Sequence, residues 1–292
     1  MAQMRTRFTR SLVGTAAAAA LGVLLLATTW SEGQTGAARN QFPRMRDGKP
    51  NLNGIWQAMN TAYWDLEAQG GGPAPDEAIQ LGAVGAIPPG LGVVEGGRIP
   101  YRPEALAKRE ENRKHWVSLD PEVRCYLPGI PRATYLPYPF QIFQSADRIV
   151  FAYQYSYARR IVNMGKPVEA PVDTWMGWPN GRWDGNSLVI DNTAFIEPPT
   201  LRPGQPPIGG WLDRTGNFHS PALHVVERYT PMDASHLMYE ATMDDPNTYT
   251  RPWKITMPLY RRVEPNAQLL EFKCPEHVEE LYWGKYRKQS SN

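Results

Sequence analysis

The segment RWDGNSLVI, residues 182–190, carries the clearest β-hairpin signal in the chain. Its Asp184-Gly185 pair suits the two-residue type I′ turn, whose backbone twist matches the twist of the strands that it joins. Short runs rich in aromatic and β-branched residues lie on both sides of it, among them PFQIFQ, RIVFAYQY, ALHVVERYT and HLMYEATM. Such runs are typical of β-strands, so the chain from about residue 139 onward is predicted to be antiparallel β structure.

Eight or more short strands connected by hairpins predict either a β-sandwich or an up-and-down barrel. The last predicted hairpin pairs residues 252–262 with residues 268–276 through a turn near Glu264. No strand–helix–strand alternation is visible in the sequence, which argues against a doubly wound α/β fold. No repeat of about 20–50 residues is visible either, which argues against a solenoid or a propeller. We expect a single β domain at residues 38–292.

One clear helix is predicted at PEALAKREENRKHWV, residues 103–117, where Pro stands in the first turn, acidic residues come early and basic residues follow. Its apolar face is thin, which predicts a helix on the surface. Residues 69–100 are rich in Gly and Pro and predict an irregular loop that covers a barrel mouth. A mobile insertion without function is the alternative. Residues 65–120 are thus expected to form a loop-plus-helix insertion.

Residues 1–37 have the pattern of a secretory signal peptide. Three arginines precede an apolar run from Leu12 to about Ala27, which is short for a membrane span and rich in small residues. We expect cleavage between residues 29 and 37 and an exported protein, periplasmic or secreted, with an uncleaved N-terminal anchor as the alternative. No second apolar run of spanning length follows, so no stable membrane insertion is expected.

Charge and motif content exclude several partners. The chain holds 31 Lys and Arg and 29 Asp and Glu, and the part after residue 37 holds 28 of each. Such a neutral balance argues against a nucleic-acid binder that works by neutralising phosphates. The glycine-rich motifs that cradle nucleotide phosphates are not found in the sequence, so no cofactor is predicted.

The sequence contains two cysteines, Cys125 and Cys274. An even number of cysteines in an exported protein predicts a disulfide bond between them. Two buried free thiols are the alternative. Neither cysteine belongs to a C-x-x-C motif, so catalysis of thiol–disulfide exchange is not expected.

Gly54-Ile55-Trp56, at the start of a predicted strand, is similar to the Gly-x-Trp opening of lipocalin-like barrels. Four longer segments resemble a family of largely uncharacterised exported bacterial proteins: DPEVRCYLPGIPR (120–132), WMGWPNGRWDGNSLVIDN (175–192), WLDRTGNFHSPALHVVERY (211–229) and DDPNTYTRPW (244–253). The resemblance covers most of the chain after residue 37. It implies a mainly β, antiparallel lipocalin-like (calycin) barrel and carries no settled activity or catalytic residue.

The strand at residues 223–230 places polar groups on both of its faces, because successive side chains alternate. Glu227 and Tyr229 share one face, whereas His224 and Arg228 share the other. In a barrel one of these faces points into the lumen, where His224 or Glu227 would be a ligand-binding or acid–base group. A satisfied polar network or an exterior position in solvent is the alternative.

The loop before this strand holds a candidate acid–base pair. Asp213 could orient His219, and His219 could transfer a proton near neutral pH; ordinary pairing within the loop is the alternative. Glu271, in the last predicted strand, is a further lumen candidate whose buried carboxyl would act as a general acid or base. His219 and His224 are five residues apart, which fits the spacing of metal ligands on neither a strand nor a helix, so no metal site is predicted.

Tryptophan and tyrosine are abundant, with 10 Trp and 14 Tyr in the chain. A lumen lined by several indole rings suits an aromatic or polycyclic ligand, although core packing is the commoner role of such residues. The predicted ligand-binding residues are Trp56, Trp175, Trp183, Trp211, Trp253, Tyr229 and Arg228.

Together these patterns predict an exported barrel that binds or acts on a small apolar or aromatic molecule. Cofactor-independent acid–base catalysis of the lyase, hydratase or isomerase type is the catalytic form of this hypothesis. A non-catalytic carrier and a hydrolase that activates water are alternatives. The long Gly/Pro-rich segment leaves a structural or partner-binding role in the cell envelope as a third possibility.

Overall fold

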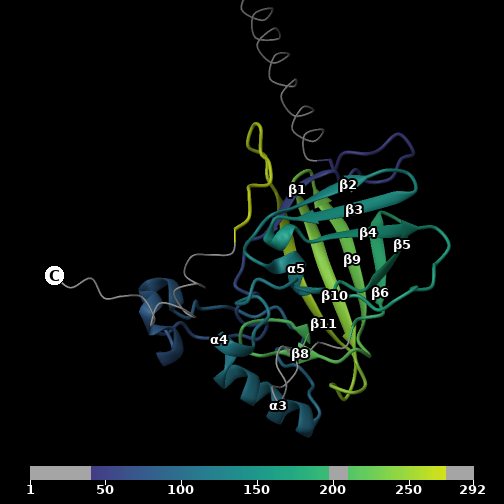
Figure 1. Ribbon diagram of the computed structural model, residues 1–292. Coiled ribbons are helices and arrows are strands. Elements are labelled where there is room, and N and C mark those ends of the chain that lie inside the picture. The colour runs from purple at the N-terminus through teal and green to yellow at the C-terminus, as the bar shows by residue number, and fades with distance from the viewer. Residues whose placement is uncertain (1–40, 197–209, 274–292) are drawn as a thin grey trace, which may run out of the picture. The chain divides into compact units, whose positions relative to one another are not determined.

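The computed structural model describes residues 41–196 and 210–273 and is dominated by a closed barrel of nine strands (Figure 1). In ring order the strands are β1 (Gly54–Ala58), β11 (Trp253–Arg261), β10 (His236–Asp244), β9 (His224–Asp233), β6 (Ser187–Thr193), β5 (Trp178–Asp184), β4 (Arg159–Met164), β3 (Arg148–Tyr153) and β2 (Phe140–Gln144). The predicted mainly β barrel is therefore confirmed, and the sandwich alternative is excluded. The predicted signal segment lies outside the described residues.

Neighbouring strands are antiparallel with one exception, where β4 and β5 run parallel and Asn163 pairs with Asn180. The connection between them returns the chain to the end of the barrel at which β4 began. The expectation of a purely antiparallel barrel is thus wrong at this one pair. Parallel neighbours need a longer connection than a hairpin provides, and residues 165–177 provide it.

The predicted hairpin at residues 182–190 is confirmed, because β5 and β6 pair through Asp184 and Ser187. Its turn differs from the expectation. Gly185 has a φ of +58°, whereas Asn186 does not adopt a positive φ. A type I′ turn needs a positive φ at both central residues, so the turn is of another two-residue type.

The predicted hairpin between residues 252–262 and 268–276 is wrong. β11 pairs with β10 on one side and with β1 on the other, where Trp56 lies opposite Arg261. The described residues after Arg261 form no strand. The cause is long-range: β1 takes the free edge of β11 and so closes the ring, which leaves no unpaired edge for a following segment.

The interior of the barrel is filled by side chains from the strands. Alternate residues point inward, and the inward ones are buried and form one continuous cluster. At its centre the rings of Phe140, Phe151, Tyr153, Tyr229 and Tyr239 contact one another, with neighbouring ring centres 5.0–6.3 Å apart. Protein side chains therefore occupy the space in which a lumen ligand was expected.

The two ends of the barrel differ. Short hairpins after β2, β5 and β9 lie at one end, whereas the connections that follow β1 and β6 leave from the other. The connection after β1 contains the turn of 3₁₀ helix η1 (Asp76–Gly85) and the helices α3 (Pro103–Lys114), α4 (Trp116–Leu119) and α5 (Arg132–Tyr135). The predicted surface helix is confirmed as α3, and it ends at His115.

A second, smaller core lies beside this end of the barrel. The two-residue strands β7 (Gly210–Trp211) and β8 (Phe218–His219) pair with each other outside the barrel sheet. Trp211 and Phe218 pack in one hydrophobic cluster with Trp64 of the β1 connection and Trp116 of α4. This cluster fixes the position of the insertion. The remaining short element, η2 (Tyr155–Tyr157), joins β3 to β4.

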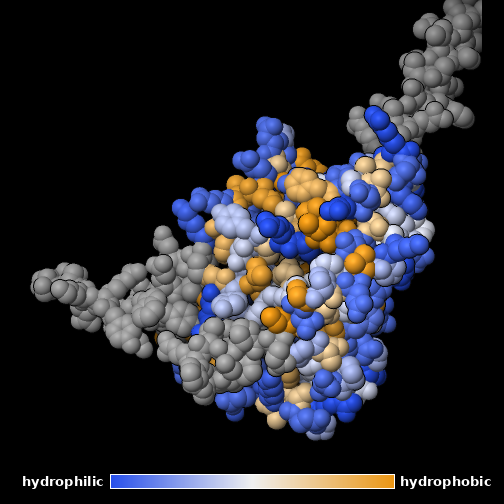
Figure 2. All heavy atoms as spheres, turned by 45° about the vertical axis from the view of Figure 1, so that its right-hand side comes forward, coloured by the Kyte–Doolittle hydropathy of each residue, from blue (hydrophilic) through white to orange (hydrophobic). Residues whose placement is uncertain are grey.

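The face that Figure 2 presents carries many hydrophilic residues, with hydrophobic residues gathered in parts of it. Exposed apolar side chains include Phe143 of β2 and Ile161 of β4, which both lie opposite Val150 of β3. None of the helices in the described parts of the chain has the length and apolar character that a membrane crossing requires.

Candidate functional site

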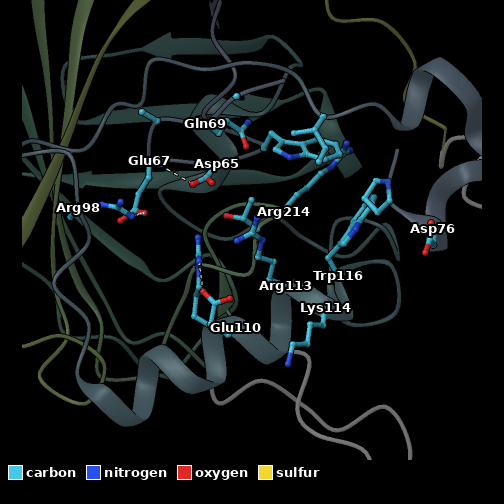
Figure 3. Close-up of a pocket in the computed structure, with 17 residues that line it drawn as sticks. Asp65, Glu67, Gln69, Asp76, Arg98, Glu110, Arg113, Lys114, Trp116 and Arg214 are labelled. Atoms are coloured by element: carbon cyan, nitrogen blue, oxygen red, sulfur yellow. Dashed lines mark hydrogen bonds and ion pairs between the residues drawn. The ribbon is translucent and has the colours of Figure 1, made fainter. Parts of the chain in front are cut away.

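A hollow of about 780 Å³ lies between the chain segment that follows β1 and helix α3 (Figure 3). We name it the Asp65 hollow. Its charged lining residues are Asp65, Glu67, Asp76, Arg98, Arg109, Glu110, Arg113, Lys114 and Arg214. Trp64, Trp116, Ile87 and Pro75 supply apolar surface. Figure 3 shows Asp65 and Glu67 on one side of the hollow and Glu110 and Lys114, on α3, on the opposite side.

The loop between β7 and β8 holds the walls of this hollow together. The amide groups of Arg214 and Thr215 donate to the carbonyl oxygens of Tyr63 and Trp64 at 3.2 and 3.1 Å. Gly216 lies against α3, and its carbonyl accepts a hydrogen bond from the Asn112 side chain at 3.2 Å. The loop therefore joins the segment after β1 to the helix on the other side of the hollow.

Asp213 anchors this loop. Its fully buried carboxylate accepts five hydrogen bonds, two from Thr215, two from Asn217 and one from the Leu66 amide, at 2.6–3.2 Å. Burial raises the pKa of Asp213, while these donors favour its ionised form. Because its carboxylate oxygens bind donors of the loop and the Leu66 amide, Asp213 does not orient His219 as predicted. It positions Leu66 and thus the neighbouring Asp65.

Arg214 continues the wall through a buried ion network. Its guanidinium donates to both oxygens of Glu122 at 2.8 and 2.9 Å and lies 5.2 and 5.9 Å from the ring centres of Trp64 and Trp116. Glu122 also accepts from Arg132 at 3.2 Å. Arg132 in turn donates to both oxygens of Asp120 at 2.7 and 2.8 Å.

This network joins two of the four segments that carry the family resemblance, residues 120–132 and 211–229. A third segment attaches to the same region, because Asp245 accepts from the backbone and the hydroxyl of Ser220 at 2.6 and 2.7 Å. Three of the four segments therefore build the walls and supports of one end of the barrel.

Asp65 is the group with the most unusual protonation in the hollow. Burial, together with the nearby negative charge of Asp213, raises its pKa from the usual 3.8 to about 7. The Glu67 amide, which donates to the Asp65 carboxylate at 2.9 Å, and the charge of Arg109 oppose the shift. At neutral pH the Asp65 carboxyl is therefore present in both its protonated and its ionised form.

The remaining charges of the hollow are partly paired. Arg98 forms an ion pair with Glu67 at 3.2 Å, and Arg109 pairs with Glu110 at 2.6 Å. Arg113 and Lys114, at the exposed end of α3, form no ion pair with the other residues that the structure describes. Their positive charges are available to an anion that enters the hollow.

The structure does not bring the two predicted histidines together. His219 is buried on β8, where its ring packs against Gly210 and against Phe195, whose ring centre is 5.3 Å away. Burial lowers the pKa of His219, so its imidazole is neutral at neutral pH. His224 lies on the outward face of β9 and pairs with Asp191. Neither histidine lines the Asp65 hollow.

Glu227 points into the barrel, as one of the two predicted alternatives requires. It forms a two-point ion pair with Arg160 of β4 and accepts hydrogen bonds from the hydroxyls of Tyr229 and Tyr239, both at 2.9 Å. The side chains of Glu227 and Arg160 are 0% and 1% exposed. Glu227 thus belongs to a buried polar network in which both of its carboxylate oxygens have partners. Tyr229, predicted as a ligand contact, is part of the same network.

Glu271 lies outside the barrel. It is exposed and contacts only Lys273 among the charged groups of the described chain, at 3.9 Å. The expectation that it faces the lumen depended on a final strand that does not form. Its side chain is 70% exposed, so it lacks the buried setting that was predicted for a general acid or base.

The predicted tryptophans do not share one cavity. Trp56 and Trp253 are buried in the barrel core, and Trp211 is buried in the smaller core. Trp175 packs on Tyr126, and Trp183 lies under the Lys49 ammonium group, 5.8 Å from its ring centre. The predicted contact Arg228 points outward and pairs with Asp184 at 2.7 Å.

The sequence-based reasoning missed Trp64, Asp65 and Trp116, which line the hollow. A signal for the first two exists in the Trp-Asp pair that follows the first strand in AYWDLEAQ, residues 62–69. The signal is weak because nothing local shows that Asp213 lies nearby. For the predicted disulfide, Cys125 is described but Cys274 lies outside the described residues, so the bond stays a prediction.

No protein-family profile, curated protein or solved structure matches the chain. The closed barrel is compatible with the lipocalin-like expectation, whereas the family itself stays a prediction. In the described parts of the chain no three His, Cys, Asp or Glu side chains are grouped so that they could hold a metal ion.

Proposed function

We propose that the protein binds a small organic acid with an apolar body in the Asp65 hollow and that Asp65 exchanges a proton with it. This is the lyase or isomerase form of the small-molecule hypothesis, with the ligand bound at the end of the barrel and not in its lumen. The observation that carries it is a hollow of about 780 Å³ in which the Asp65 carboxyl, with its raised pKa, shares the lining with cationic and indole side chains. Small-molecule sites commonly have this size and combine apolar walls with a few polar groups.

Charge supports an anionic ligand. Arg113 and Lys114 lie at the mouth of the hollow with exposed side chains, and a carboxylate is the smallest organic group that pairs well with both. The Arg214 guanidinium is paired with Glu122 and lies over the Trp64 ring. It therefore forms part of the wall, and Arg113 and Lys114 are left to bind the ligand carboxylate.

Protonation supports a proton-transfer role for Asp65. A general base works best when its pKa is close to the working pH, and the pKa of Asp65 is raised to about 7. Its carboxylate takes a proton from a carbon next to a carbonyl or a carbon–carbon double bond. The electron pair of the broken C–H bond forms a new double bond to the neighbouring carbon, and the π electrons of the existing double bond move to its far atom, which for a carbonyl is the oxygen. Return of the proton to a different carbon completes an isomerisation without any redox change. The cationic groups stabilise the negative charge that develops on the ligand oxygen.

Two parts of this proposal come from the sequence alone. The N-terminal pattern supports export to the periplasm or the medium, and the family resemblance supports a lipocalin-like barrel. In the proposed form the packed lumen serves as a scaffold, and the ligand binds among the long connections at one end. Loops positioned by a rigid scaffold commonly carry binding sites.

The test is proton exchange between the protein and carboxylic acids that have an acidic carbon–hydrogen bond. Purified protein in D₂O is incubated with 4-phenyl-3-butenoate and cyclohexenylacetate, and deuterium uptake and double-bond migration are followed by NMR. The rate should rise with pH, with a midpoint near the Asp65 pKa of about 7, and then level off, because the ionised carboxylate is the base.

The variant Asp65→Asn should lower the exchange rate by about 100-fold or more, and tryptophan fluorescence should show little change in binding. Asp76→Asn is the matched control, because Asp76 is another carboxyl of the same hollow. Saturable binding without exchange of any tested acid would assign the carrier function instead. Equal exchange rates in wild type and Asp65→Asn would contradict the role of Asp65.

A further inference from the structure

A second hollow, of about 660 Å³, shares Asp65 and Gln69 in its wall with the Asp65 hollow. We name it the wall hollow. Its other walls come from the chain after β1, from residues 89–93 and from residues 256–258 of β11. Asp65 is the only ionisable side chain among the described residues that line it. The two hollows therefore differ in chemistry, one rich in charges and the other mainly apolar.

The wall hollow exists because β11 changes its partner along its length. β1 pairs with β11 only from Arg261 to Leu259. Further along, residues 93–95 take over this edge, with hydrogen bonds from Thr256 to the Val93 carbonyl at 3.0 Å and from Glu95 to the Lys254 carbonyl at 2.8 Å. Between these two pairings Met257, which belongs to the barrel core, contributes to the lining of the wall hollow.

A narrow ribbon separates the two hollows. Gln69 and Gly90 exchange two backbone hydrogen bonds at 2.9 and 3.0 Å, and Gly72 and Ile87 exchange two at 3.0 Å. Ile87 lines the Asp65 hollow, whereas Leu91, at the end of the same ribbon, lines the wall hollow and is fully exposed. A molecule that reaches past this ribbon at Asp65 and Gln69 contacts both sides.

We propose that the two hollows hold the two halves of one amphipathic carboxylic acid. Its carboxylate lies with Arg113 and Lys114 in the Asp65 hollow, and its alkyl or ring portion lies on Leu91 and Met257 in the wall hollow. The proposal rests on the proposed function and names its substrate class. An apolar portion is favoured because most of the lining residues of the wall hollow are apolar, Leu91 and Met257 among them.

The experiment measures binding of straight-chain carboxylates by tryptophan fluorescence and titration calorimetry, at concentrations below micelle formation. Affinity should rise by about 30-fold or more from butyrate to dodecanoate, because each additional buried methylene favours transfer from water. 1-Dodecanol, which has the same chain and lacks the acid, should bind at least about 10-fold more weakly than dodecanoate.

Thr256→Trp fills the wall hollow from the outward face of β11. This variant should no longer bind dodecanoate more tightly than butyrate, and its butyrate affinity should stay within about 3-fold of wild type. Thr242→Trp is the matched control on the outward face of β10 and should behave as wild type. Leu91→Gln changes a fully exposed side chain, so it keeps the test informative if the first variant fails to fold.

The proposal is overturned if affinity still rises from butyrate to dodecanoate in both Thr256→Trp and Leu91→Gln. It is also overturned if the control Thr242→Trp loses this rise in affinity to the same extent. The proposed function fails in a different way. If butyrate does not bind wild type and no acid exchanges protons, the Asp65 hollow is not the site. If butyrate binds and exchange depends on Asp65 while longer chains bind no better, only the amphipathic ligand is excluded.

Discussion

Asp65 is held in the fold at a cost in stability. Its pKa is about 7 in the folded protein, against the usual 3.8 in an unfolded chain. Between these values the folded protein binds a proton that the unfolded chain releases, so the unfolding free energy falls as pH rises from about 4 to about 7 and is level above. Asp65→Asn removes this penalty and retains an oxygen that can accept the Glu67 amide hydrogen bond.

We therefore expect Asp65→Asn to raise the unfolding free energy by about 1–2 kcal/mol at about pH 8 and to change it little at about pH 4, after allowance for solvent screening. Urea unfolding at the two pH values measures this. The charges that face Asp65, namely Asp213, Arg109 and Glu67, are unchanged in the variant. Asp147→Asn, at an exposed hairpin, is the control. A variant less stable than wild type at the higher pH would contradict a raised pKa.

The sequence could not reveal Asp65, because its raised pKa comes from burial and from the charge of Asp213, which lies in a distant loop and leaves no mark on the local sequence pattern. It did place Glu227 and Tyr229 on one face of a strand, since alternation is a local property. Which partner they meet depends on Arg160, three strands away around the ring. Roles of single residues were therefore least predictable where the partner comes from another part of the chain.

The contact between α3 and the β7–β8 loop depends on Gly216. Its φ is +87°, and a Cβ atom would meet the Asn112 Cβ at 2.7 Å and backbone atoms of α3 at 2.8–2.9 Å. Gly216→Ala should therefore lower the unfolding free energy by about 2–4 kcal/mol and displace α3. Because α3 carries Arg113 and Lys114, butyrate binding should weaken in proportion, as thermal unfolding and calorimetry would show.

Gly97→Ala is the control that separates the strain of a positive φ from the steric clash of the added Cβ atom with α3. Gly97 has a φ of +79° and no heavy atom within 4 Å of an added Cβ, so it carries the strain of a positive φ alone, about 1 kcal/mol. If Gly216→Ala and Gly97→Ala lower the unfolding free energy by the same amount, the close contact between the β7–β8 loop and α3 does not stabilise this wall of the hollow.

Elements with local signals were predicted well and those with distant partners were not. The β5–β6 hairpin and α3 follow from a turn dipeptide and from the order of charges along a helix. The false hairpin after β11 had equally good local signals, but β1 occupies the required edge. Local patterns determine whether a segment forms a strand, whereas strand partners are set by closure of the whole sheet.

At the scale of the whole molecule, the barrel is held from within by a polar bridge. Arg160 of β4 and Glu227 of β9 connect strands that are not neighbours in the ring, and Tyr239 of β10 joins them through its hydroxyl. The sequence predicted a barrel with an inward carboxylate, but it also predicted an open lumen. A filled interior follows from the size of the inward side chains, which only the register reveals.

This bridge gives a test that separates scaffold from site. Arg160→Met leaves Glu227 buried and unpaired and should cost about 3–5 kcal/mol, whereas Arg160→Met combined with Glu227→Leu should cost less than the single change. Some loss should remain, since the tyrosine hydroxyls lose their acceptor. Arg182→Met, at an exposed ion pair with Asp191, should change stability by less than about 1 kcal/mol.

Urea unfolding of wild type, Arg160→Met, Glu227→Leu and the double variant measures the coupling between Arg160 and Glu227. In variants that remain folded, butyrate and dodecanoate should bind as in wild type, because neither residue lines the two hollows. If Arg160→Met instead abolished binding while its unfolding free energy stayed unchanged, the ligand would have to reach the buried Arg160–Glu227 bridge. The function would then belong to the barrel interior, and the hollows at its end and side would be surface features.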